Sequence, residues 1–489
     1  MPEQTLEKDR LDPRAWRILS VAVLGSFLSQ LDATVVNVSL SNLAAELHSS
    51  LPVIQWVTSG YLLALALMLP LNGWLVERIG AKRLYLVCFS GFTLASALCA
   101  LSWSAGSLIA FRLVQGVSGG LMAPMAQLVL ARVAGPRHLV RVVGYAAVPV
   151  LLGPILGPVI AGAILQHATW HWLFLTNLPI GVLAVVLAFL FLPDDDVVKG
   201  VARGLDLIGL LLLSPGLVLF LYGSDHLGEQ TGITAILLST ILLAAFVFKA
   251  SKDRERALID LQLFRSRVFS ASAVTQFTAN GLSFAGQMLI PIYLIRAASE
   301  SPSVAGWLMA PLGLGMMCTY PWLGKLTQRF GIRGTSTGGA TVAFLGTLPF
   351  LYLSSHPLNL LILAGTLFIR GVGMSAVGIP SISAAYGSVR KEELPMAATS
   401  LNIVQRLGGP TLTNLCATFL GWQLAVHSPG NVTNAFTLSF ALLCSLHALL
   451  IVAAMRLPLS LEKMQHPPAE ELGEGCREGV TQPRSGASG

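Results

Sequence analysis

The sequence has 489 residues, of which 54% are hydrophobic and 11% charged, and its formal net charge is +7. So little polar surface cannot cover soluble domains of this size, which indicates an integral membrane protein. Six scattered cysteines exclude a disulfide scaffold, and we expect neither a metal site nor a cofactor. The sequence lacks a nucleotide-binding loop, an HExxH motif and a nucleophile constellation, so we do not expect an enzyme.

Runs of about 20 apolar residues, the length that crosses a bilayer as a helix, are the main signal along the chain. They predict fourteen transmembrane segments, at residues 17–42, 54–76, 84–104, 106–131, 142–166, 171–192, 206–223, 232–248, 268–295, 303–324, 335–353, 357–386, 396–426 and 432–455. All but four of the 31 Lys and Arg residues fall in the two tails and in alternate loops. The positive-inside rule therefore places both termini in the cytoplasm. It also explains the net charge by lipid contact, without a nucleic-acid partner.

Four residues of the first half recur in the second half, each 251 positions later. The pairs are Trp56 and Trp307, Gly73 and Gly324, Arg78 and Arg329, and Gly80 and Gly331. This repeat predicts an all-α membrane fold of two parallel six-helix halves with two extra central helices. The predicted parts are a cytoplasmic tail, an N-terminal bundle, a linker with the two extra helices, a C-terminal bundle and a disordered cytoplasmic tail, at residues 1–16, 17–192, 193–267, 268–455 and 456–489.

Four strongly charged residues are expected deep inside the predicted segments, namely Asp32, Arg112, Arg370 and Arg406. A charge at the bilayer centre costs about 2.5 to 3.5 kcal/mol on insertion scales, so Asp32 should face water or a partner. Burial favours its protonated form and a nearby cation favours its ionised form, which suits a proton carrier. The alternative is a permanent structural pair between Asp32 and an arginine.

The three arginines also have two interpretations each. Arg112 shares a helix face with Gln115, and we expect it to tune the protonation of Asp32. The alternative is an arginine that is held by hydrogen bonds and serves structure alone. Arg370 and Arg406 either bind an anionic group of a substrate or tie helices together.

Two glycine-containing stretches suggest moving parts. In GWLVERIGAKR at 73–83, we expect Glu77 to pair with a cation across the loop or with the N-terminus of a neighbouring helix, and so to latch one conformation. The alternative is that the loop only sets topology by its positive charge. The stretch GYAAVPVLLGPILGPVIAG at 144–162 mixes prolines and glycines, which predicts a kinked and closely packed helix. It would act as a pivot or seal between the halves, or form an ordinary glycine-lined contact.

Together these segments resemble the fourteen-helix drug/proton antiporter family of the major facilitator superfamily, over residues from about 15 to 456. LDATVVNVSL at 31–40 and RLVQGVSGG at 112–120 are similar to its proton-coupling motifs, although Ser41 replaces a usual proline. RGLDLIGLLLL and LIDLQLFRSRVF look like the segments that flank its two extra helices. The resemblance implies proton coupling by Asp32 and Arg112, with matches at Thr34, Asn37, Gln115 and Gly116. It implies a gating loop at Gly73, Glu77, Arg78, Gly80, Lys82 and Arg83, and an antiporter motif at Gly153, Pro154, Gly157 and Pro158.

The resemblance further implies a proton-coupled antiporter that exports hydrophobic or amphipathic small molecules from a bacterial plasma (inner) membrane by alternating access. The alternatives are a proton symporter or facilitator for a metabolite, and a non-transporting membrane sensor. The tenth segment lacks the extra carboxylate that some relatives carry, so strongly dicationic substrates are not expected. In a cell with two membranes, a periplasmic adaptor and an outer-membrane channel would be the expected partners.

A substrate pocket of this kind combines apolar walls with a few polar groups. Each polar residue has the alternative role of a hydrogen bond between packed helices. The candidates for the pocket are Gln30, Thr34, Asn37, Gln55, Tyr61, Gln115, Gln127, Gln276, Asn280, Met288, Arg370, Asn402, Gln405 and Arg406.

Overall fold

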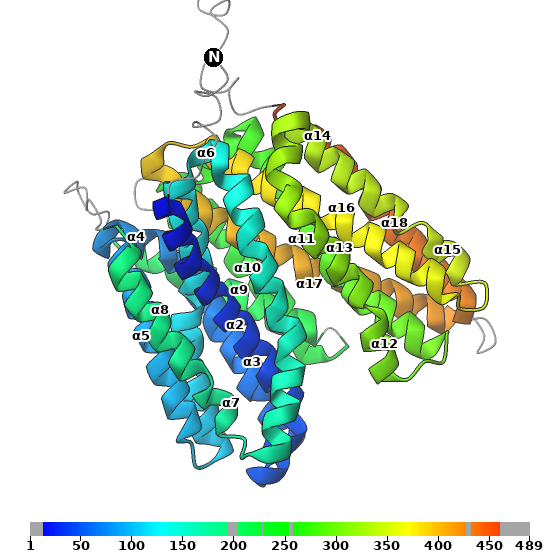
Figure 1. The fold of residues 1–489 in the computed structure, drawn as a ribbon, viewed down its shortest axis with the longest axis horizontal. Coiled ribbons are helices and arrows are strands. Elements are labelled where there is room, and N and C mark those ends of the chain that lie inside the picture. The colour runs from blue at the N-terminus through cyan, green and yellow to red at the C-terminus, as the bar shows by residue number, and fades with distance from the viewer. Residues whose placement is uncertain (1–12, 194–203, 227, 254–257, 427–431, 460–489) are drawn as a thin grey trace, which may run out of the picture.

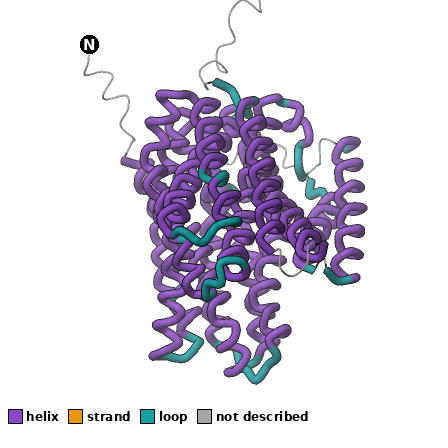
Figure 2. Tube along the Cα trace, turned by 90° about the vertical axis from the view of Figure 1, so that its right-hand side faces the viewer, coloured by secondary structure: helices purple, strands orange, loops and turns teal. Residues whose placement is uncertain are grey.

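The computed structural model describes residues 13–193, 204–226, 228–253, 258–426 and 432–459, and all regular structure in these residues is helical (Figures 1 and 2). Most of both predicted tails lies outside the described residues, so the expected disorder of the C-terminal tail stays a prediction. Ten stretches of the described helices are long and apolar enough to cross a membrane. The protein is therefore a multi-pass membrane protein.

The first half of the chain forms one helical bundle. Its elements are α2 (Pro13–Glu46), α3 (Leu51–Met68), η1 (Leu69–Leu71), α4 (Asn72–Ile79), α5 (Ala81–Ala100), α6 (Ala105–His167), α7 (Trp172–Leu175) and α8 (Asn177–Phe191). Large apolar side chains fill its core, among them Phe89 and Phe92, which are fully buried.

α6 contains both the fourth and the fifth predicted segments in one assigned helix of 63 residues. Its residue Arg112 contacts Asp32 of α2, while Gly157 lies against Thr34, only two residues further along α2. In a straight helix, the 45 positions between residues 112 and 157 would span about 68 Å. The chain of α6 therefore turns back on itself between them, and its two arms match the two predicted segments.

The second half of the chain contains an accessory helix pair followed by a second bundle. The pair is α9 (Leu207–Asp225) and α10 (Gln230–Lys252), and η2 (Leu261–Arg265) follows it. The second bundle comprises α11 (Arg267–Arg296), α12 (Pro302–Leu308), α13 (Ala310–Thr319), η3 (Tyr320–Trp322), α14 (Leu323–Leu345), α15 (Pro349–Leu353), α16 (Leu360–Gly387), η4 (Lys391–Glu393), α17 (Leu394–Val426) and α18 (Val432–Met455).

The two bundles repeat each other in register. α3 and α12 start after the caps Ser50 and Ser301, and η1 and η3 interrupt the following helix around Pro70 and Pro321. Proline lacks the backbone donor that an α-helix needs, which accounts for a 3₁₀ turn at both places. Gly80 and Gly331 both have positive φ, at 87° and 74°. All three pairs of features are 251 residues apart, so the repeat predicted from the sequence is present in the backbone.

The count of fourteen membrane segments stays a prediction, although every predicted segment is helical over nearly its whole length. Three predicted segments are not among the ten apolar stretches. For the fifth, the apolar stretch His138–Gly153 is shorter than a span. The ninth and thirteenth fall in α11 and α17, which have 30 and 33 residues. They carry polar groups such as Gln276, Asn280 and Arg406, which lower their hydropathy. The tenth and eleventh predicted segments fall together in one stretch, Val304–Leu353.

The two bundles meet at the end where the basic loops lie. Val140 of α6 packs with Leu323 and Ile379 of the second bundle, and Gly144 lies against the carbonyl of Tyr320. Toward the opposite end, where α7 and α12 lie, Figure 1 shows the bundles diverging. The structure is therefore closed between the halves at one end.

The accessory pair packs across the junction of the two halves. Leu213 and Leu217 of α9 share an apolar cluster with Leu69 of η1 and Ile403 of α17. The Ser214 hydroxyl of α9 also donates to the carbonyl of Leu67, at 2.8 Å. α9 therefore contacts both bundles.

Candidate functional site

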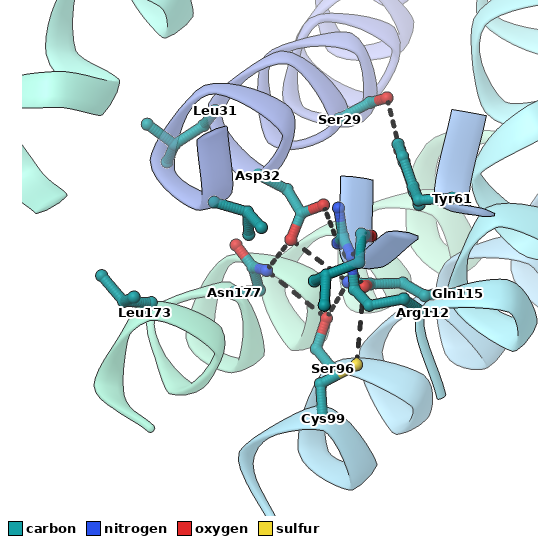
Figure 3. A network of polar contacts seen from close by, with 12 residues as sticks. Ser29, Leu31, Asp32, Tyr61, Ser96, Cys99, Arg112, Gln115, Leu173 and Asn177 are labelled. Carbon is teal, nitrogen blue, oxygen red and sulfur yellow. Dashed lines mark hydrogen bonds and ion pairs between the residues drawn. The ribbon is translucent and has the colours of Figure 1, made fainter. Parts of the chain in front are cut away.

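Asp32 lies fully buried on α2 in a ring of donors from two other helices (Figure 3). Arg112 Nη1 of α6 donates to its Oδ2 at 2.6 Å. Its Oδ1 accepts from Asn177 Nδ2 of α8 at 2.7 Å and from Gln115 Nε2 of α6 at 3.2 Å. Both oxygens of the carboxylate therefore accept hydrogen bonds from neighbouring helices.

Arg112 has no exposed surface and is held by the same network. Its Nη1 also donates to Gln115 Oε1 at 2.6 Å, and its Nε donates to the carbonyl of Val57 at 3.1 Å. The guanidinium lies over the ring of Tyr61, 4.2 Å from the centroid, a cation–π contact. Nη2 is buried and has no hydrogen-bond partner among the described residues. The charge of Arg112 is therefore compensated by one carboxylate, while one of its nitrogens lacks a hydrogen-bond acceptor.

Two members of this network were not predicted. Asn177 is fully buried, and its amide reaches both Asp32 and Ser96, the latter at 3.4 Å. Ser96 of α5 in turn accepts from Gln115 Nε2 at 2.7 Å. An amide inside the apolar segment at 171–192 was a usable signal for Asn177. Ser96 carried none, because serine is common on helices.

Hydrogen bonds between described residues link the two halves near the end where the bundles meet, which we call the contact end. Asn72 Nδ2 of α4 donates to Thr399 Oγ1 of α17 at 3.3 Å. Gln127 Oε1 of α6 accepts from Asn402 Nδ2 at 3.0 Å and from the Tyr386 hydroxyl at 3.2 Å. Gln127 and Asn402, two of the pocket candidates, therefore link the halves in this conformation.

The residues of the expected gating loop lie at the same end. Gly73 is buried against Met396 and Thr399 of α17, and Gly80 makes the turn between α4 and α5. Arg78 lies over the ring of Trp74 and Lys82 over that of Phe189, at 5.1 and 5.6 Å. Glu77 is half-buried, and Arg83 is exposed.

The expected antiporter motif packs inside the N-terminal half. Gly153 lies against Gln30 and Leu31 of α2, and Gly157 lies against Thr34. Thr34 Oγ1 donates to the carbonyls of Gln30 and Gly153, at 2.7 and 3.4 Å. These two glycines therefore contact a helix of the same bundle, and the role of the stretch 144–162 as a pivot or seal between the halves stays a prediction. The side chains of Pro154 and Pro158 lie outside the described residues.

Arg370 is buried in the core of the second bundle. Its Nη2 donates to the carbonyl of Leu282 at 2.9 Å, and its guanidinium occupies the space beside Gly286. Nη1 is buried without a hydrogen-bond partner, and within the described chain no carboxylate pairs with it. This arrangement favours the structural interpretation of Arg370.

Some of the other pocket candidates are bound or packed inside the second bundle, and others are exposed. Gln276 is buried and donates to Gly378 O at 2.5 Å, and Asn280 donates to Gln405 O at 2.6 Å, both within the second bundle. Met288 packs at the edge of the core of that bundle. Gln30 and Gln55 are exposed. The side chain of Asn37 lies outside the described residues.

A second buried ion pair was not predicted. Asp206 is 5% exposed, caps the start of α9 by accepting from Gly209 N at 2.7 Å, and pairs with Lys249 of α10. The expectation that Asp32 is the one carboxylate deep in the bilayer stays a prediction. Asp206 lies at a helix end in the accessory pair, away from the network around Asp32.

Comparison with known proteins identifies the family. Residues 22–413 match the model of the Major Facilitator Superfamily. The chain belongs to this superfamily. It is therefore a membrane transporter rather than an enzyme.

Two relatives and two solved structures extend this result. The chain is 34% identical over 422 residues to the Multidrug resistance protein B homolog of Mycobacterium tuberculosis, covering 85% of this chain and 78% of that protein. It is 29% identical over 462 residues to MdtD of Citrobacter koseri, covering 92% and 96%. A double Trp mutant of XylE superimposes with a TM-score of 0.65 at 14% identity, covering 93% and 99%. The human organic anion transporter MFSD10 superimposes with a TM-score of 0.62 at 16% identity, covering 91% and 100%. These two structures are similar in fold.

Proposed function

We propose that this transporter is a proton-coupled antiporter that exports hydrophobic or amphipathic small molecules. The observation that carries the proposal is the buried pair of Asp32 and Arg112, at 2.6 Å, inside a bundle of a membrane transporter. Its relative in Mycobacterium tuberculosis is named for multidrug resistance, which supports the export of drug-like compounds.

The chemistry of the pair fits proton exchange. A proton on Asp32 neutralises the carboxylate and leaves the Arg112 guanidinium as an uncompensated buried charge. Breaking a buried ion pair by removing one partner costs about 3 to 5 kcal/mol, which is enough to shift a conformational equilibrium strongly. Protonation and the conformation of the carrier are therefore expected to be linked, as antiport requires.

The transport cycle would use the two halves as rigid bodies. With fourteen spans and both termini in the cytoplasm, the end that carries the basic loops is the cytoplasmic end. In the present conformation the halves are then in contact at the cytoplasmic end. We assign the chain to a bacterial plasma membrane, with the proton as its coupling ion and no cofactor, and an adaptor and outer channel as partners where a second membrane exists.

The first test is proton flux in proteoliposomes with a lumenal pH dye, an imposed pH gradient and a panel of lipophilic compounds. Wild-type protein should release protons when a substrate is added, and Asp32→Asn should not. Asp206→Asn is the matched control, because it makes the same change at another buried ion pair and keeps a helix cap. It should retain coupling.

Two outcomes would change the proposal. Substrate movement with no proton signal in any variant would indicate a facilitator or another coupling ion. Proton and substrate moving in the same direction would indicate a symporter.

A further inference from the structure

The two oxygens of the Asp32 carboxylate have different partners. Oδ2 accepts from Arg112 Nη1 of α6 at 2.6 Å, whereas Oδ1 accepts from two amides, Asn177 Nδ2 of α8 at 2.7 Å and Gln115 Nε2 of α6 at 3.2 Å (Figure 3). All four side chains are buried. Once protonated, the acid becomes a donor itself, and its O–H needs an acceptor inside this buried network.

Oδ2 is the less suitable of the two oxygens for the proton. The Arg112 guanidinium carries N–H donors and no acceptor. An O–H on Oδ2 would point a donor at a donor across the 2.6 Å contact, beside a positive charge. The proton is therefore expected on Oδ1, while Oδ2 accepts from Arg112 in both protonation states.

Gln115, one of the two amides at Oδ1, is held in one orientation. Its Oε1 accepts from Arg112 Nη1 at 2.6 Å and from the Cys99 thiol at 3.8 Å. Its Nε2 donates to the Ser96 hydroxyl at 2.7 Å. Reversing this amide would place its NH₂ group against an N–H donor of the guanidinium. Gln115 therefore stays a donor toward Asp32 and does not accept the proton.

Asn177, the other amide at Oδ1, is free to reverse. Its Nδ2 donates to Asp32 Oδ1 at 2.7 Å and to the Ser96 hydroxyl at 3.4 Å, and within the described chain it makes no hydrogen bond with a cation. Reversing an amide exchanges its nitrogen and oxygen with little change of shape. The Ser96 hydroxyl can match either orientation, because a hydroxyl both donates and accepts. After the reversal, the Asn177 oxygen faces Oδ1 as an acceptor.

The other titratable side chains around the pair do not compete for this role. Tyr61 of α3 lies under the Arg112 guanidinium, and its hydroxyl is 3.4 Å from that of Ser29. Cys99 of α5 donates to an amide oxygen of the network. In the part of the chain that the structure describes, neither Tyr61 nor Cys99 makes a hydrogen bond with Asp32. The acceptor for its O–H is therefore an uncharged amide.

We propose that Asn177 is the positioning residue that holds the transported proton on Oδ1 of Asp32. With Asp32 ionised, the amide donates to Oδ1 through Nδ2, as in the present structure. When a proton from water forms an O–H bond at Oδ1, the amide reverses and its oxygen accepts that O–H. Release of the proton to water at the other membrane face breaks the O–H bond, and the amide reverses again. The inference rests on the proposed function, because that function assigns Asp32 as the proton site.

The test is infrared difference spectroscopy of the full chain in liposomes, recorded between an alkaline and an acidic buffer without any substrate. Protonation of Asp32 should produce the carbonyl band of a carboxylic acid, and Asp32→Asn should lack this band. A hydrogen bond that the acid donates lowers the frequency of its carbonyl band. Asn177→Leu removes the acceptor at a similar side-chain volume, so the band should move to higher frequency.

Two further variants separate the hydrogen bond from packing. Asn177→Gln retains an amide and should keep the band close to its wild-type frequency. Asn280→Leu makes the same change as Asn177→Leu in the second bundle, where Asn280 donates to the carbonyl of Gln405, and it should leave the band in place. In the dye assay, Asn177→Leu should lower substrate-evoked proton flux about tenfold or more, the effect of losing one hydrogen bond to an ionised group.

A second measurement needs no variant of Asn177. The wild-type chain would be isotopically labelled at the side-chain carbonyl of asparagine. The same difference spectrum should then contain a label-sensitive amide band, because the Asn177 oxygen gains a hydrogen bond when Asp32 is protonated. Asp32→Asn should lack this band as well.

Three results would overturn the inference. The first is an Asp32 band that stays at its wild-type frequency in Asn177→Leu, and the second is an equal shift in Asn177→Gln or Asn280→Leu. The third is the absence of a label-sensitive asparagine band. The proposed function fails separately, because a wild-type spectrum without any carboxyl band that depends on Asp32 would reject Asp32 as the proton site. A band that depends on Asp32 but ignores Asn177 would reject this inference alone.

Discussion

Arg112 and Arg370 lie on the fourth helix of their respective halves and have very different surroundings. Both are almost completely buried. Arg112 meets a carboxylate, an amide, a backbone carbonyl and a tyrosine ring. Arg370 meets one backbone carbonyl, from Leu282, and has no acidic partner in the described chain.

The difference shows that the duplicated halves have been specialised. The position 251 residues after Asp32 is Ser283, so the second half kept an arginine without the acid. A carboxylate that is paired with a buried cation can take up a proton in place of that pairing. Arg370 has no carboxylate partner in the described chain, so no acid beside it can take up a proton. Proton coupling is therefore expected in the N-terminal half.

The largest effect is expected from Arg112→Met. Without the guanidinium, Asp32 keeps its two amide donors but loses its counter-charge, so it should hold its proton throughout the cycle. Substrate-evoked proton flux in liposomes should fall by at least about 100-fold. Size-exclusion chromatography should still show a monodisperse, folded protein. Flux close to that of the wild type would return Arg112 to a structural role.

The companion change in the other half, Arg370→Met, should leave coupling intact. Replacing a buried charge by an apolar side chain of similar volume is often neutral or stabilising. The melting temperature should stay the same or rise, and proton flux should stay within about twofold of wild type. A loss of flux equal to that of Arg112→Met would contradict the specialisation of the halves.

A smaller effect is expected from Gly286→Ala, which probes how Arg370 fits. A Cβ at this position would collide with the Arg370 guanidinium. The variant should lose about 1 to 3 kcal/mol of stability by overpacking, measured as a lower thermal midpoint. The double variant with Arg370→Met should recover most of this loss, because the shorter-reaching apolar chain can move away. Equal losses in the single and double variants would place the clash elsewhere.

Much of this arrangement could be predicted from the residues. The apolar runs and the alternation of basic loops predicted the transmembrane segments. The recurrence of residues such as Trp56 and Gly80 predicted the repeat. Asp32 and Arg112 were predictable as partners because isolated charges inside a bilayer need compensation. The specific contacts of this network with Asn177 and Ser96 were not, because they depend on how α5, α6 and α8 pack in three dimensions.

Other contacts were not predictable for a similar reason. Gly153 and Gly157 indicated a close helix contact, but nothing in the sequence tells whether the partner helix belongs to the same half. Asp206 was overlooked as a second buried acid because its partner, Lys249, lies 43 residues later and reads as a loop cation. Partner choice between distant segments is set by tertiary packing, which a single sequence does not display.

The smallest effects concern Gly80 and Gly331, where the halves are most alike. Both have positive φ, so alanine should destabilise each by about 1 kcal/mol from backbone strain alone. At Gly331 a Cβ would also collide with the carbonyl oxygen of Leu459. Gly331→Ala should therefore lower the thermal midpoint by more than backbone strain alone explains. A loss no larger than the strain of about 1 kcal/mol would mean that the packing of residues 457–459 onto α14 adds little to the stability of the second half.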